Sequence, residues 1–188
     1  YLAAVVDARE KLRAAKPEDK MAVFAVLMRL RQICCDPRLV ADNWSGGSAK
    51  LDACMELVTA AVEGGHRILL FSQFTSMLDL LAQRLDEAGV SHFTLQGSTP
   101  KPVRAELVRR FNSGEADVFL ISLRAGGTGL NLTAADIVIH YDPWWNVAAQ
   151  NQATDRAYRI GQRNPVQVYK LIAQDTIEEK IVELQQAK

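Results

Sequence analysis

The sequence predicts an α/β fold: a doubly wound, mainly parallel sheet with helices on both faces, preceded by an N-terminal helical segment. After residue 65, short apolar runs alternate with segments whose apolar residues recur at the helical period. Before that point, apolar residues recur at helical spacing only. The change of pattern at Gly64 and Gly65 predicts a helical lead-in over residues 1–65 and an α/β domain over residues 66–188.

The lead-in is predicted to be helical, with interruptions at Pro17 and Pro37. Ser48 is expected to cap a further helix, which Gly64 and Gly65 end. The apolar stripe of that helix repeats every three or four positions, at Leu51, Met55, Val58 and Val62.

Five apolar runs predict strands over residues 68–71, 91–95, 118–121, 137–140 and 166–172. Helices are expected between them, and one should start at Ser98 or Thr99, just ahead of Pro100. A last helix is expected to begin at Asp175, with Glu178 completing a capping box. Its predicted buried stripe is Ile177, Ile181 and Leu184.

Composition narrows the class of protein. The 22 basic residues equal the 22 acidic ones, so a nucleic-acid surface would have to be a local patch. The three cysteines, Cys34, Cys35 and Cys54, match neither a disulfide framework nor a zinc ligand pattern. We therefore expect buried thiols, no metal site and a reducing compartment, cytoplasmic or nuclear. No apolar run approaches the roughly 18 residues of a membrane span, so no membrane partner is expected.

Polar loops follow the predicted strands. Ligands of open parallel sheets bind beyond the carboxyl ends of the strands, and these loops offer hydroxyls, amides and glycine backbone suited to phosphate oxygens. The alternative is that the glycines only make turns and the hydroxyls only cap helices. The loop residues in question are Ser72, Gln73, Gly97, Ser98, Thr99, Ser122, Arg124, Gly126, Gly127 and Gly129.

The stretch QATDRAYRIGQ, residues 152–162, carries two arginines. If it starts as helix, Gln152, Arg156 and Arg159 share one face. Guanidinium groups bind phosphate oxygens in a bidentate fork and offset the charge that develops during phosphoryl transfer. The alternative is a solvated face with an Asp155–Arg159 ion pair.

Five ordered stretches resemble the C-terminal helicase motifs of the Swi/Snf group of helicase superfamily two. They are LLFSQF (69–74), LQGSTP (95–100), ISLRAGGTGLNL (121–132), HYDPWWN (140–146) and QATDRAYRIGQ. The resemblance covers residues 67–188, and the RIGQ ending distinguishes the group from DEAD-box RNA helicases. RQICCDPRLV (31–40) resembles the segment that enters this lobe.

The resemblance implies a RecA-like lobe in which Arg156 and Arg159 are catalytic arginine fingers. They would reach ATP with Mg²⁺ that is bound mainly by an N-terminal RecA-like lobe of the same polypeptide. It also implies that Gln152, Asp155, Gly127, Gly129 and Asn131 couple the nucleotide state to the grip on DNA. The residues implied to hold double-stranded DNA are Ser72, Gln73, Gly97, Ser98, Thr99, Ser122, Arg124, Gly126 and Trp145.

Trp144, in the fourth stretch, and Val147, directly after it, carry separate expectations. Trp144 can either contact DNA or pack against the following helix. Val147 stands where the family commonly has proline, and we expect a slightly altered helix start there with no change of activity.

The implied function is ATP-driven translocation along double-stranded DNA, with a DNA-bound protein as a further partner. The sequence contains no GxxxxGKS or GxxxxGKT phosphate loop and no acidic motif after a strand. The chain alone is therefore not expected to turn over ATP. One alternative is a degenerate helicase lobe kept as a DNA-binding or scaffolding module. Another is an unrelated doubly wound nucleotide-binding domain, although no GxGxxG follows the first predicted strand.

Overall fold

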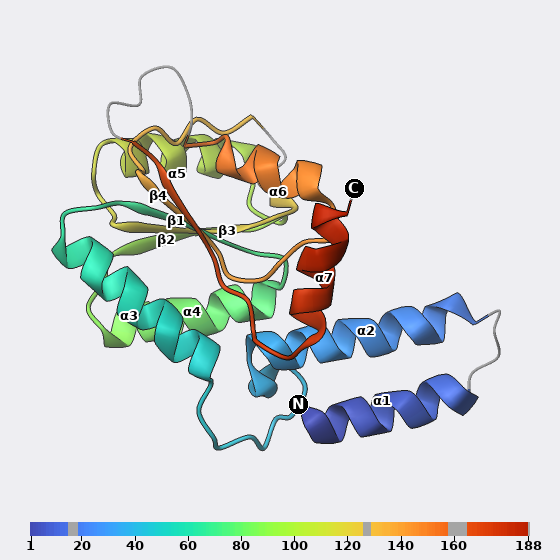
Figure 1. Ribbon diagram of the computed structural model, residues 1–188. Coiled ribbons are helices and arrows are strands. Elements are labelled where there is room, and N and C mark those ends of the chain that lie inside the picture. Colours follow the sequence, from blue (N-terminus) through green and yellow to red (C-terminus); the bar gives the residue numbers. More distant parts are fainter. Residues whose placement is uncertain (15–18, 126–128, 158–164, 188) are drawn as a thin grey trace.

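The computed structural model describes residues 1–14, 19–125, 129–157 and 165–187 (Figure 1). Its centre is a five-stranded parallel sheet of strand order β2-β3-β1-β4-β5, which confirms the predicted doubly wound α/β class. The strands are β1 Ile68–Ser72, β2 His92–Leu95, β3 Val118–Ser122, β4 Ile137–His140 and β5 Gln167–Lys170. All five predicted strands are present, and β5 is shorter than expected.

The central strand β1 is hydrogen-bonded to β3 on one side and to β4 on the other. All residues of β1, β3 and β4 are buried, because helices cover both faces of the sheet. Strand β5 lies at one edge, and its four residues are exposed. Burial on both faces explains why the central strands read as continuous apolar runs.

Helices α3 Ala49–Glu63 and α4 Thr75–Glu87 lie against one face of the sheet, and α5 Lys101–Asn112 and α6 Val147–Thr154 against the other (Figure 1). Alternate residues of β1 point to opposite faces. Ile68 and Leu70 join a core with α3 and α4, whereas Leu69 and Phe71 join a core that includes Phe111 of α5. The sheet thus separates two apolar clusters.

Helices α1 Leu2–Ala14 and α2 Lys20–Cys35 run side by side, and α7 Ile177–Gln186 packs on α2 (Figure 1). A short 3₁₀ helix, Pro37–Leu39, follows α2. Helix α3 precedes Gly65, yet Leu51, Cys54 and Val58 are fully buried in the core that the sheet also lines. Helix α3 therefore packs against the sheet of the α/β unit, and the division into a lead-in over residues 1–65 and a domain over residues 66–188 stays a prediction.

One predicted helix start is confirmed and two are wrong. The Ser48 hydroxyl accepts a hydrogen bond from the amide of Leu51, as predicted. Helix α5 begins at Lys101 without a side-chain cap, because the Thr99 hydroxyl accepts from the amide of Gln96 instead. Helix α7 is capped by Thr176, which accepts from the amide of Glu178, whereas Asp175 precedes the cap with a φ of 56°.

The predicted apolar stripe of α7 is only partly correct, since Ile181 is buried but Leu184 is exposed. The three cysteines are free and buried in helices, as expected. Within the described residues, no helix is long and apolar enough to cross a membrane.

Candidate functional site at the carboxyl edge of the sheet

All five strands run in one direction, so their carboxyl ends lie at a single edge, which we call the carboxyl edge. The fold brings the predicted loop residues together there, at the ends of β1, β2, β3 and β4. Gly126 and Gly127, which were predicted for the same edge, lie outside the described residues.

Ser72 at the end of β1 is fully buried. Its hydroxyl donates to Asp142 Oδ1 at 2.6 Å and accepts from the amide of Phe74 at 3.2 Å. The amide of Gln73 donates to the other carboxylate oxygen of Asp142 at 3.4 Å. The Ser72 hydroxyl therefore shapes the turn after β1 and is not displayed to a ligand. The sequence reasoning missed Asp142, although it lies within HYDPWWN.

The Asp142 carboxyl group is buried at the junction of the loops after β1 and β4. Burial raises its pKa to about 6, against the hydrogen bond from Ser72 and the positive charges of Lys50 and Arg31. Two loops of the carboxyl edge thus share a group that titrates near neutral pH.

His140, the last residue of β4, links the sheet to α6. Its ring stacks on Phe71 with centroids 5.6 Å apart, and Nε2 lies 2.8 Å from the Thr154 hydroxyl. Burial lowers the pKa of His140 to about 4, and the nearby charge of Lys170 acts in the same direction. The neutral imidazole of His140 therefore connects the end of β4 to Thr154 of α6.

The loop after β2 is held by Arg104 of α5. Its guanidinium donates to the carbonyl oxygens of Thr99 and Gly97 at 2.7 Å each, and to that of Gln96 at 3.3 Å. Gly97 and Ser98 remain exposed on this loop. Arg104 was not predicted, although an arginine one turn into a helix that follows a glycine loop could have indicated it.

The loop after β3 resembles the one after β1 in its use of serine. The hydroxyl of Ser122 is buried and accepts from the amide of Ala125 at 3.2 Å, so it too shapes a turn. Arg124 on the same loop is exposed. Of the polar side chains predicted on this loop, the structure thus leaves Arg124 accessible and covers Ser122.

The predicted helical face of Gln152, Arg156 and Arg159 does not extend to Arg156. Helix α6 ends at Thr154, and Arg156 lies in the turn beyond it. Gln152 and Asp155 are exposed, but Arg156 is only 3% exposed. Arg159 lies outside the described residues.

Arg156 contacts residues 129–132, which include Gly129 and Asn131, predicted to couple the nucleotide state to the grip on DNA. The amide of Leu132 donates to the carbonyl oxygen of Arg156 at 3.2 Å. In the same segment Gly129 adopts a positive φ of 44°, and the exposed Asn131 accepts at its carbonyl oxygen from Asn112. One hydrogen bond thus joins the turn that carries Arg156 to the segment that carries Gly129 and Asn131.

ATP with Mg²⁺ requires donors for its phosphate oxygens and oxygen ligands for the metal ion. Guanidinium and amide groups suit phosphate oxygens, but Arg156 would have to leave its buried position to reach a nucleotide on another lobe. No cluster of three or more His, Cys, Asp or Glu side chains suited to a metal ion occurs within the described ranges.

The two tryptophans lie on the loop after β4. Trp145 is 38% exposed and Trp144 is half-buried. Asn146 caps α6 by accepting from the amide of Ala149, so the helix starts at Val147. Gln150 of α6 accepts from the amide of Trp144 at 3.2 Å.

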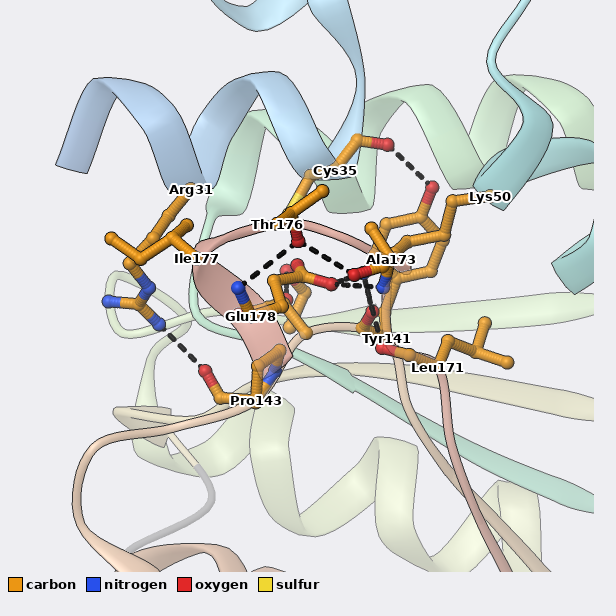
Figure 2. A network of polar contacts seen from close by, with 12 residues as sticks. Arg31, Cys35, Lys50, Tyr141, Pro143, Leu171, Ala173, Thr176, Ile177 and Glu178 are labelled. Carbon is orange, nitrogen blue, oxygen red and sulfur yellow. Dashed lines mark hydrogen bonds and ion pairs between the residues drawn. The ribbon is translucent and has the colours of Figure 1, made fainter. Parts of the chain in front are cut away.

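A buried polar network connects α3 and α7 to the segments just after β4 and β5 (Figure 2). The Lys50 ammonium at the start of α3 donates to the carbonyl oxygens of Tyr141 and Leu171, one residue beyond the ends of β4 and β5, at 3.1 Å each. It also pairs with the buried Glu178 carboxylate of α7, which accepts from the amide of Ala173 at 2.8 Å. Sequence reasoning assigned Glu178 to a capping box and missed Lys50.

Comparison with known proteins shows what the chain is similar to. Residues 49–161 match the model of the helicase conserved C-terminal domain. The chain is 39% identical over 95% of its length to an "Uncharacterized ATP-dependent helicase" of Mycoplasma pneumoniae, of which it covers 17%. It is also 39% identical, over 94% of its length, to the mouse "SWI/SNF-related matrix-associated actin-dependent regulator of chromatin subfamily A member 1", of which it covers 18%.

Among solved structures, the Sulfolobus solfataricus SWI2/SNF2 ATPase core in complex with double-stranded DNA superimposes with a TM-score of 0.84. The identity is 32%, and the match covers 99% of this chain and 40% of that one. The chain spans less than a fifth of the length of the two relatives named above.

Proposed function

Because this chain belongs to the family of helicase conserved C-terminal domains, and within it to the Swi/Snf type, we propose that it works as the C-terminal half of an ATP-driven translocase on double-stranded DNA. The observation that carries the proposal is the position of the polar loops, which follow four neighbouring parallel strands and meet at the carboxyl edge. A phosphate backbone can be held by such an array of loops without any reading of base sequence.

In this proposal the accessible groups of the carboxyl edge contact DNA phosphates and sugars. Gly97, Ser98, Arg124 and Trp145 are exposed and supply backbone, hydroxyl, cationic and aromatic groups. Ser72 and Ser122 are buried and accept from the amides of Phe74 and Ala125, so we assign them to loop geometry. Gly126, Gln73 and Thr99 complete the proposed DNA surface.

ATP with Mg²⁺ would supply the phosphoryl group that is transferred, and it would be bound mainly by an N-terminal lobe of the same polypeptide. We propose that Arg156 and Arg159 add guanidinium charge to that site when the lobes close. Arg156 is buried in this lobe, so closure would have to draw its side chain outward. The hydrogen bond from Leu132 to the Arg156 carbonyl oxygen then offers a route from nucleotide to residues 129–132.

A second candidate function is a degenerate lobe that binds or scaffolds DNA complexes without ATP turnover. The burial of Arg156 favours it, because a guanidinium packed inside the lobe serves the fold without a nucleotide. In either case a DNA-bound protein is the proposed target, in the bacterial cytoplasm at the nucleoid or in a eukaryotic nucleus.

The test is the ATPase rate of a polypeptide that carries both lobes, with and without duplex DNA, for wild type, Arg156→Ala and Arg159→Ala. Loss of an arginine finger lowers the rate by roughly 10³-fold or more. Arg109→Ala removes an exposed arginine of α5 and should leave the rate unchanged. Thermal melting of Arg156→Ala separates lost catalysis from lost folding.

Two results would redirect the assignment. If no variant, wild type included, hydrolyses ATP, the scaffolding function replaces the translocase. If the 188-residue chain alone binds ATP or a dinucleotide at micromolar affinity, the site belongs to a different class of nucleotide-binding domain.

A further inference from the structure

Side chains from three different helices hold residues 143–146, which we call the tryptophan loop. Arg31 of α2 donates from Nη2 to the carbonyl oxygen of Pro143 at 2.7 Å (Figure 2). Gln150 of α6 accepts from the amide of Trp144, and Gln185 of α7 donates to the carbonyl oxygen of Trp144. The backbone of this loop is therefore restrained on either side of Trp144.

Arg31 does more than donate one hydrogen bond. Its guanidinium carbon lies 5.3 Å from the ring centroid of Trp145 and 6.0 Å from that of Trp144. The Phe74 ring, in the turn after β1, lies 5.8 Å away. A cation within about 6 Å of an aromatic centroid is attracted by the ring quadrupole, most strongly when both are shielded from water. Arg31 is 2% exposed, so its charge is shielded from water, whereas the Trp145 ring is 38% exposed.

The Arg31 guanidinium also interacts electrostatically with the buried Asp142. Burial lowers the pKa of Arg31, and the charge of Asp142 acts in the opposite direction. One guanidinium thus joins α2, the turn after β1 and the tryptophan loop, which are far apart in the sequence.

We propose that Arg31 is a positioning residue that sets the orientation of Trp145 for contact with DNA. This inference rests on the proposed function for its DNA consequence, but the contact between Arg31 and Trp145 is a property of this lobe alone. A planar guanidinium can lie against three rings and donate to Pro143 at once, whereas a lysine ammonium is a compact point charge. Lysine should therefore restore only part of the arrangement.

The first experiment follows the orientation of Trp145 without DNA. Three tryptophans occur in the sequence, so Trp44→Phe with Trp144→Phe leaves Trp145 as the only one. In this background Arg31→Met should raise the acrylamide quenching constant of Trp145 at least twofold, and Arg31→Lys should raise it less. Arg29→Met removes an exposed arginine two residues away on α2 and serves as the matched control.

The second experiment uses the polypeptide with both lobes and measures ATPase rate against duplex concentration. Arg31→Met should raise the half-saturating duplex concentration about tenfold, while its rate at saturating duplex should fall less than threefold. The half-saturating concentration of Arg31→Lys should lie between those of wild type and Arg31→Met. Because Arg31 acts through Trp145, Arg31→Met added to Trp145→Ala should change the half-saturating concentration by less than twofold.

The outcomes separate the two proposals. If Trp145→Ala leaves the duplex dependence unchanged, the DNA contact fails while the quenching result still decides the role of Arg31. If quenching of Trp145 is the same in wild type and Arg31→Met, the positioning role is refuted. The positioning role is also refuted if the double variant raises the half-saturating duplex concentration by the product of the two single-variant factors. Should Arg31→Met not fold, Gln185→Leu, which removes another restraint on the same loop, takes its place in both experiments.

Discussion

The Ser72 hydroxyl donates to the Asp142 carboxylate at 2.6 Å and joins the turn after β1 to the loop after β4, although 70 residues separate the two in the sequence. Both side chains are buried, so the protonation state of Asp142 affects the stability of the carboxyl edge.

Asp142→Asn should change how stability depends on pH. The pKa of Asp142 is raised from 3.8 to about 6, so its stabilising contribution is full below pH 4 and is lost as the pH rises through 6. His140, lowered from 6.5 to about 4, has the opposite effect, because its contribution grows between pH 4 and 6.5. In Asp142→Asn, the increase in stability that His140 causes between pH 4 and 6.5 should therefore no longer be offset by the loss from Asp142.

Urea unfolding at pH 4, 5, 6 and 6.5 measures this difference. The free energy of unfolding of Asp142→Asn should rise more than that of wild type across the range, by up to about 3 kcal/mol at roughly 1.4 kcal/mol per pKa unit. Asp7→Asn, an exposed change on α1, is the control. Identical profiles for wild type and Asp142→Asn would contradict the shifted pKa.

Lys50→Met should be among the most destabilising single substitutions at the carboxyl edge. It leaves the Glu178 carboxylate buried without its charge partner and leaves two strand-end carbonyl groups without their ammonium donor. Removal of one partner from a buried pair costs about 3–5 kcal/mol. The exposed Lys11–Asp7 pair of α1 provides the control, since Lys11→Met should have no measurable effect.

The double variant Lys50→Met with Glu178→Leu sharpens this test. Its free energy of unfolding should be equal to or higher than that of Lys50→Met alone, because no unpaired charge remains buried. Costs that add fully in a double-mutant cycle would show that the pair is not coupled.

Arg104→Met should loosen the loop after β2 and weaken the grip on DNA. It removes the hydrogen bonds that a charged donor makes to the carbonyl oxygens of Gln96, Gly97 and Thr99. We expect a loss of about 2 kcal/mol in the free energy of unfolding, and a higher half-saturating duplex concentration in the ATPase assay. Arg109→Met, on the same helix, should leave both quantities unchanged; an equal effect of the two variants would contradict the prediction.

The three cysteine thiols should be inert in the folded chain. Burial raises the pKa of Cys34 to about 11 and that of Cys54 to about 12, and it raises the pKa of Cys35 as well. At pH 8 a disulfide reagent such as DTNB should therefore label none of them within minutes and all three in urea. Ala105→Cys, exposed on α5, should add one rapidly reacting thiol. Rapid labelling of the wild type would contradict the buried positions.

The five strands and their parallel arrangement could be predicted from the sequence because the relevant signal is local. Strands buried on both faces need continuous apolar residues, and the runs that become β1, β3 and β4 contain little else. The Ser48 cap was predictable for the same reason, since a hydroxyl and an amide three residues apart decide it.

The environment of the site residues depended on tertiary contacts that no local pattern contains. The sequence identified Ser72, Ser122 and Arg156 as ligand-facing groups, but all three side chains are buried in the folded lobe. Glu178 was expected to complete a capping box with Asp175, yet its carboxylate pairs with Lys50, 128 residues earlier, and Thr176 caps α7.

Arg31 illustrates the same limit. Its partner Pro143 lies 112 residues away, and only the packing of α2 beneath the tryptophan loop brings them together. Periodicity and motif order thus determine which segments become strands and which loops share an edge. Tertiary packing decides which polar groups on that edge face outward and which become internal supports, because desolvation and pairing depend on neighbours that are distant in the chain.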